Sequence, residues 1–201
     1  MSGSALRQAA AISWLVLASA LYSGSAEAHV GTGLPGGVAE GFAHPFGGFD
    51  HLLAMVSVGL WGAFLRRPLI YVLPVVFPVV MVAGAALGMF GIPLPRVEIG
   101  VAVSVLVLGA CIAAAWKAPI AAASLIVAVF ALFHGYAHGR ELPSAADPVG
   151  YSFGFVLATG LLHVLGIGTL ANRPKTMVIV RVIGAAIACV GVVFVRNAVS
   201  A

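Results

Sequence analysis

Six long apolar segments run through this chain, and they restrict it to folds that cross a membrane. They cover residues 48–65, 69–91, 97–116, 119–138, 148–171 and 176–196, each close to the ~20 residues that a bilayer-spanning helix needs. Only 8% of the 201 residues are charged, against about a quarter in soluble domains. Strands of a β-barrel would be about half as long and would alternate in polarity. The sequence therefore predicts an all-α integral membrane protein with a six-helix transmembrane bundle.

The N-terminal residues have the features of a targeting signal. Arg7 precedes the apolar run AAAISWLVLASALY, and the tripeptide AEA at 26–28 fits a cleavage site of small residues. We expect a cleaved signal peptide over 1–28 and one transmembrane domain over 29–201. An uncleaved first span is the alternative, but the small, polar sequence SGSAEAHVGTG that follows favours cleavage.

The basic residues between the predicted spans indicate an orientation. Signal cleavage places residue 29 outside the cytoplasm, so the inner connections carry Arg66, Arg67, Lys117, Arg173 and Lys175. The outer side of the mature chain carries fewer, namely Arg96, Arg140 and Arg196. The positive-inside rule agrees with the signal peptide. We expect a multi-pass protein of the bacterial inner membrane with both mature termini in the periplasm.

Charge and cysteine usage exclude several classes of function. The net charge is +4 and the basic residues are scattered, whereas nucleic-acid binding needs a basic face. Cys111 and Cys189 stand alone among apolar residues, without zinc-type spacing, and are expected to be packing residues.

Small residues and prolines indicate how the spans pack. Gly84 and Gly88 form a GxxxG pair that favours close helix contact. Pro74 and Pro78 lie one turn apart in the second span and predict a kink, either static or part of a gate.

A histidine cluster ends the fourth span. In FHGYAHGRE, His134 and His138 are four residues apart, so a helix places them on one face, ~6 Å apart along its axis. Glu141 follows three residues later, near the same face if the last turn persists. The topology places this cluster on the outer side.

A second cluster opens the first span, in HPFGGFDHLLAM. His44 precedes a proline, which favours an extended conformation, and the two following glycines allow a turn back towards Asp50 and His51. Both clusters therefore converge on the outer mouth of the bundle. Imidazoles with carboxylates suit nickel, cobalt, copper or zinc, whereas magnesium and calcium prefer oxygen ligands.

Simpler interpretations exist for several of these residues. Asp50 has the residue type of a helix N-cap, and Glu98 could complement a helix N-terminus. His29 would chelate an ion only if cleavage frees it. His163, deep in the fifth span, is either a relay below the mouth or a histidine bonded to a neighbouring helix. Met55 is a soft ligand by chemistry, but core packing is the favoured role.

The two histidine motifs resemble those of the HupE/UreJ family. His44-x5-Asp50-His51 followed by LLAM and VGLW is similar to its first motif, and FHGYAHGRE is similar to its FHGxAHGxE motif. The resemblance covers the whole chain. It implies a hydrogenase or urease accessory membrane protein that transports Ni²⁺, or Co²⁺ in some members. It also implies roles for the motif residues His44, Asp50, His51, His134, His138 and Glu141.

These observations predict a permease or facilitator, not an enzyme, that admits Ni²⁺ from the periplasm for nickel-enzyme maturation. Its partners are a divalent metal ion and the lipid bilayer, with no nucleic acid and no organic cofactor. The alternatives are a membrane-embedded metalloenzyme and a metal chaperone that does not transport. The chain contains neither an HExxH motif nor a phosphate-binding loop.

Overall fold

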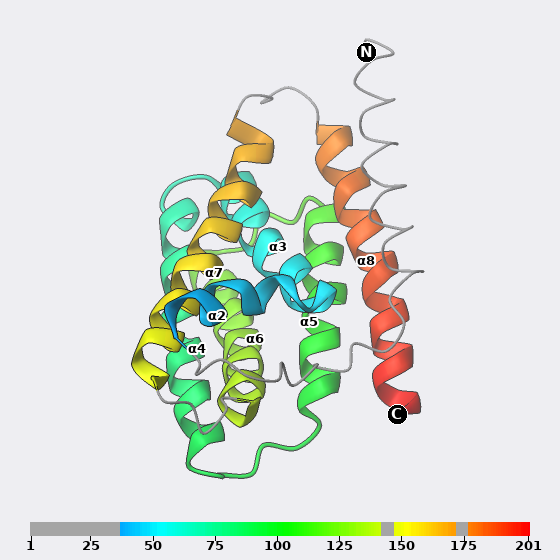
Figure 1. The fold of residues 1–201 in the computed structure, drawn as a ribbon. Coiled ribbons are helices and arrows are strands. Elements are labelled where there is room, and N and C mark those ends of the chain that lie inside the picture. The colour runs from blue at the N-terminus through cyan, green and yellow to red at the C-terminus, as the bar shows by residue number, and fades with distance from the viewer. Residues whose placement is uncertain (1–36, 142–146, 172–176) are drawn as a thin grey trace.

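The computed structural model describes residues 37–141, 147–171 and 177–201. This part of the chain is helical and contains no strand (Figure 1). Its elements are α2 (Val38–Ala43), the 3₁₀ turn η1 (His44–Phe46), α3 (Phe49–Leu65), α4 (Leu69–Met89), α5 (Val97–Ala113), α6 (Ile120–Glu141), α7 (Pro148–Ala171) and α8 (Met177–Ser200). Helices α3 to α8 lie at the six predicted segments. The predicted signal peptide lies outside the described residues.

The lengths and composition of these helices identify an α-helical, multi-pass membrane protein. Within the described ranges, four helices are long and apolar enough to cross a bilayer, and these are α4, α6, α7 and α8. The α2–η1 segment and α3 pass the same test together, but they are bent by 87°. Helix α5 is an apolar helix of 17 residues, shorter than a typical span. Six crossings therefore stay a prediction.

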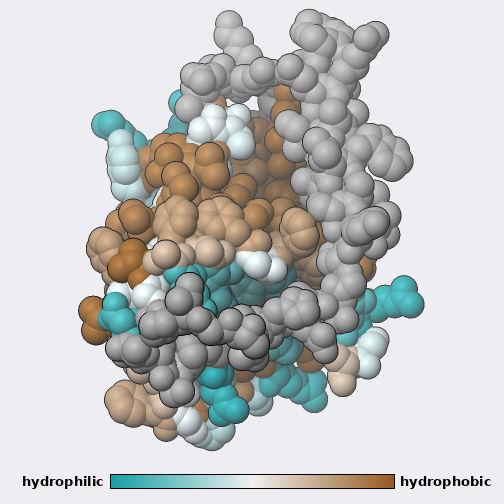
Figure 2. Space-filling model, viewed as in Figure 1, coloured by the Kyte–Doolittle hydropathy of each residue, from teal (hydrophilic) through white to brown (hydrophobic). Residues whose placement is uncertain are grey.

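The helices pack as a bundle of long neighbours. Helix α4 runs along α6, α5 along α8, and α3 along α7. Figure 1 shows the α3–α4 and α5–α6 connections at one end and the α4–α5 connection at the other. Figure 1 also shows α2 crossing the bundle between its two ends, where it contacts α7. In Figure 2 hydrophobic residues occupy the upper and middle part of the visible face, and hydrophilic residues gather below them at the level of α2.

Glycines set the close approach of α6 to α4. A Cβ added to Gly135 would overlap the Met81 carbonyl, and one added to Gly139 would overlap the Ala85 carbonyl. The predicted GxxxG pair contributes from the other side, where Gly84 faces Leu132. Backbones can approach this closely only where no side chain intervenes. The glycines of FHGYAHGRE therefore fix the distance at which α6 lies from α4.

The two prolines of α4 leave the helix unbroken. Pro74 and Pro78 both lie inside a continuous helix. In an α-helix each carbonyl accepts a hydrogen bond from the N–H four residues later. Because proline has no N–H, the carbonyls of Ile70 and Pro74 have no such donor. Phe77 lies between the prolines and is fully buried.

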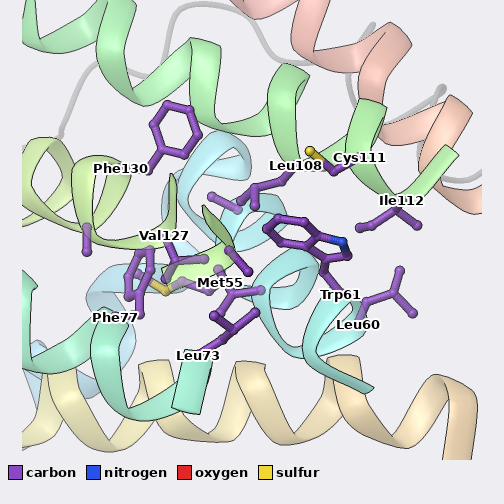
Figure 3. Packing of buried hydrophobic residues seen from close by; sticks show 14 of the residues in the cluster. Met55, Leu60, Trp61, Leu73, Phe77, Leu108, Cys111, Ile112, Val127 and Phe130 are labelled. Carbon is purple, nitrogen blue, oxygen red and sulfur yellow. The ribbon is translucent and has the colours of Figure 1, made fainter. Parts of the chain in front are cut away.

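A single apolar core fills the bundle around these helices (Figure 3). Its members include Trp61 of α3, Phe77 and Leu73 of α4, Leu108 of α5 and Phe130 of α6. Cys111 belongs to this core, whereas Cys189 is exposed on α8.

Candidate metal-binding site

His44 is helical, so the predicted extended conformation was wrong. It ends α2 with φ −55° and ψ −47° and begins η1, with Pro45 buried behind it. A proline restricts the residue before it but fits the first turn of a helix. The helical conformation of His44 follows from the packing of α2 across α7. The two helices approach closely, since a Cβ on Gly41 would overlap the Tyr151 carbonyl and one on Gly154 would overlap the Val38 carbonyl.

Four histidines from both motifs form one series of ring contacts. The rings of His44 and His138 lie 4.8 Å apart between centroids, and those of His138 and His51 lie 4.5 Å apart. His51 then meets His134 at 4.8 Å. The series therefore runs from η1 through α6 and α3 to a buried position on α6. The structure brings together residues that are about ninety positions apart in sequence.

Asp50 orients His51 at the start of α3. One carboxylate oxygen accepts hydrogen bonds from the backbone N–H of His51 and from its Nδ1, both at 2.8 Å. The helix N-cap is Gly48, so Asp50 is not the N-cap, although it satisfies one backbone donor of the first turn. With its proton on Nδ1, His51 presents Nε2 as the nitrogen that can bind a metal. A carboxylate–histidine pair of this kind orients metal ligands in many proteins.

Ser104 holds His134 in the same way from α5. The Ser104 hydroxyl donates to the Val101 carbonyl at 2.6 Å and lies 2.9 Å from Nε2 of His134. Because the hydroxyl proton is used, Nε2–H of His134 donates to Ser104. The lone pair of His134 is then on Nδ1, which has no hydrogen-bond partner among the described residues.

Two of the four histidines are buried inside the bundle, whereas His44 and His51 are partly exposed. His134 is 0% exposed and His138 5%. The ring of Phe155 lies 4.3 Å from that of His138, and Tyr151 lies 5.7 Å from His44. These two α7 aromatics therefore pack against the His44 and His138 end of the ring series.

A cavity of about 170 Å³ adjoins the cluster between α4, α6 and α7. Its wall is mostly apolar, and its polar members are His138, Tyr151 and Ser152. His138 is the member of the histidine cluster that lines this cavity.

The ring arrangement is not a closed metal cage. Among the side chains that the structure describes, which do not include that of Glu141, no group of three or more His, Cys, Asp or Glu is placed to hold one ion together. The imidazoles meet largely edge to face, with interplanar angles of 80° for His44–His138 and 85° for His51–His134. The full ligand set therefore stays a prediction, and any joint coordination requires the rings to turn about their χ angles.

The remaining predicted residues lie elsewhere. Glu141 is the last residue of α6, and the structure describes its backbone only. Glu98 is exposed in the first turn of α5, the position expected of an acid that complements a helix N-terminus. His29 lies outside the described residues. His163 is buried in α7, and Met55 is fully buried in the core.

Sequence reasoning missed Ser104, Tyr151 and Phe155. Ser104 is a single hydroxyl within an apolar span, a signal too common in membrane helices to single it out. Tyr151 and Phe155 share a helix face at i and i+4. Nothing in their spacing indicates that this face meets histidines.

Comparison with known proteins identifies the family of this chain. The family model described as HupE / UreJ protein matches residues 16–194. The chain belongs to the HupE/UreJ family. It is 45% identical over 168 residues to Protein HupE of Rhizobium leguminosarum bv. viciae, which covers 83% of this chain and 87% of that relative. No solved structure matches the chain. The HupE/UreJ resemblance of the two motifs is thus confirmed.

Proposed function

We propose that this protein is a permease or facilitator that carries Ni²⁺, or Co²⁺, from the periplasm into the cytoplasm. The ion would supply the maturation of a nickel enzyme, a hydrogenase or a urease. The observation that carries the proposal is a pair of oriented imidazoles, of which His134 is fully buried and His51 partly buried. Asp50 holds His51 by Nδ1 and Ser104 holds His134 by Nε2, and the two rings lie 4.8 Å apart.

This donor chemistry suits a borderline divalent ion. Imidazole nitrogens bind nickel and cobalt well, and the Asp50 carboxylate offsets part of the ion's charge. Magnesium and calcium would find too few oxygen ligands here. The proposed substrate is therefore a transition-metal ion.

The spread of the histidines favours passage over storage. His44 lies at one end of the ring series and His134 at the other, so an ion can exchange one imidazole for the next. Conduction needs binding that is weak or divided among sites. The membrane potential favours inward movement of a cation by about 2.3 kcal/mol per elementary charge per 100 mV.

The proposal includes the finer topology predicted from the sequence. A signal peptide over 1–28 is removed, six spans follow, and both mature termini face the periplasm across the inner membrane. Broken segments near the middle of a membrane often form binding sites, and the 87° bend before α3 is such a break.

Radioactive nickel uptake tests the function. Cells that express the wild type should accumulate nickel above a vector control. His44→Ala, Asp50→Ala and His138→Ala should each lower uptake by about ten-fold or more at equal membrane levels. Glu40→Ala is the matched control, because this exposed carboxylate of α2 lies outside the ring series.

The same experiment separates the alternatives. A metal chaperone would bind Ni²⁺ in detergent without supporting uptake. Wild-type cells that accumulate no more nickel than the vector control would refute the permease. Normal uptake by all three variants would refute the proposed ligands.

A further inference from the structure

A second polar group lies further along the bundle than the histidine cluster. His163 of α7 is 1% exposed, and neither of its ring nitrogens has a hydrogen-bond partner among the described residues. An imidazole buried without a partner loses its hydration and gains nothing in return. An ionisable residue inside a membrane helix is a functional candidate for this reason.

The ring of Phe77 contacts both His163 and the histidine cluster. Its centroid is 5.6 Å from that of His134 and 5.4 Å from that of His163. Phe77 is fully buried. One apolar ring thus contacts a histidine of the cluster and His163.

A hydroxyl and a thioether that could bind a metal ion meet one helical turn from His163. Thr159 lies one turn before His163 on α7, and its hydroxyl is 3.5 Å from the Met55 sulfur. Figure 3 shows Met55 in the same part of the core as Phe77. The Pro74 carbonyl lies near the His163 ring without hydrogen-bond geometry. It has no intrahelical donor, since the residue four positions on is a proline.

We propose that His163, with the Thr159 hydroxyl and the Met55 thioether, forms an inner cation site, and that Phe77 divides it from the histidine cluster. The inference rests on the proposed function, because it names the next step of the same ion. Imidazole and thioether donors select soft or borderline transition-metal ions. These metal ligands include no carboxylate. The inner site therefore binds the ion more weakly than the histidine cluster beside Asp50 does, and it releases the ion onward.

Binding of Co²⁺ by the purified full chain in detergent tests the inner site. The visible absorption of Co²⁺ reports nitrogen and sulfur ligands. His163→Leu should bind one equivalent fewer than the wild type, whereas Asp50→Ala should retain the inner equivalent. Since leucine replaces an unsatisfied polar group by an apolar one, His163→Leu should be as stable as the wild type or more stable. If His163 served only to stabilise the fold, His163→Leu would be less stable than the wild type. His163→Gln serves as a second variant of similar polarity.

Nickel uptake tests whether the inner site lies on the transport path. His163→Leu should lower uptake by about ten-fold at equal membrane levels. If its uptake or its Co²⁺ stoichiometry equals that of the wild type, the inner site is overturned while the permease stands. If the wild type itself takes up no nickel, the permease fails, and the Co²⁺ stoichiometry still decides the inner site.

Variants of similar size test the other two proposed metal ligands, Thr159 and Met55. Thr159→Val removes the hydroxyl and should weaken inner-site Co²⁺ binding, whereas Thr159→Ser should restore it. Met55→Leu removes the sulfur at nearly constant volume and should lower the affinity for soft ions. Equal Co²⁺ affinity in Thr159→Val and Thr159→Ser would exclude the hydroxyl from the site.

Truncation of the dividing ring tests Phe77. Phe77→Ala should speed the arrival of Co²⁺ at the inner site in stopped-flow absorption measurements. Phe130→Ala is the matched control, because Phe130 is a buried core phenylalanine of the same helix as His134. An arrival rate equal to that of the wild type would contradict the dividing role.

Discussion

At the scale of single residues, the site depends on which nitrogen of each histidine is already engaged. Asp50 engages Nδ1 of His51, and Ser104 engages Nε2 of His134. Each contact fixes a tautomer and a ring orientation, and leaves the other nitrogen to bind an ion. The residues that hold the imidazoles are therefore as informative as the imidazoles themselves.

Ser104→Ala tests this orientation directly. Loss of the hydroxyl leaves Nε2 of His134 buried without its partner, so we expect nickel affinity to fall by about ten-fold. The measurement is the concentration dependence of nickel uptake at equal membrane levels. Ser124→Ala is the control, since the Ser124 hydroxyl has no hydrogen-bond partner among the described residues. If both variants behave alike, Ser104 does not position His134.

At the scale of helices, close backbone contact places the second motif. Gly135 and Gly139 face the carbonyls of Met81 and Ala85, so α6 is held at a short distance from α4. His134 lies next to one of these glycines and meets Phe77 of α4. The motif thus couples a packing surface to a ligand surface on one helix.

Gly135→Ala should separate α6 from α4. A Cβ there overlaps backbone, which cannot move as a side chain can, and we expect a destabilisation of about 1–3 kcal/mol. A lower Tm in detergent is the measurement. Gly160→Ala is the control, because a Cβ at Gly160 has no neighbour within 4 Å and alanine favours helix. An unchanged Tm for Gly135→Ala would show that the α4–α6 contact is loose.

The prolines of α4 offer a second test at this scale. Pro78→Ala supplies an N–H to the Pro74 carbonyl, which then turns from the His163 ring into the helix. We expect equal or higher thermal stability with nickel uptake lowered several-fold. Pro74→Ala is the control, because residue 78 still lacks an N–H and the carbonyl at position 74 stays without an intrahelical donor. Equal uptake by both variants would exclude that carbonyl from the path.

At the scale of the whole molecule, the connections alternate between two ends. Arg66, Arg67 and Lys117 lie in connections at one end, and the α4–α5 connection with Arg96 lies at the other (Figure 1). This arrangement agrees with the distribution of charge from which the orientation was predicted. The orientation across the membrane itself stays a prediction.

Thiol labelling of intact spheroplasts tests that orientation. A cysteine introduced as Ile92→Cys in the α4–α5 connection should react with an impermeant maleimide from outside. Arg67→Cys should react only after permeabilisation, and both positions are exposed. The native Cys111 and Cys189 are replaced by alanine beforehand. The reverse labelling pattern would invert the topology.

The sequence by itself determined the class of protein, the positions of α3 to α8 and the family. These depend on hydropathy and motif spacing, which are local properties of the chain. Local rules were wrong at His44, where proline bias predicted an extended residue and the packing of α2 on α7 produced a helical one. Only the tertiary structure decided that Ser104 holds His134 and that Phe77 contacts both His134 and His163. The physical reason is that such contacts depend on helix rotation and on the distance between backbones, which packing sets across the whole bundle.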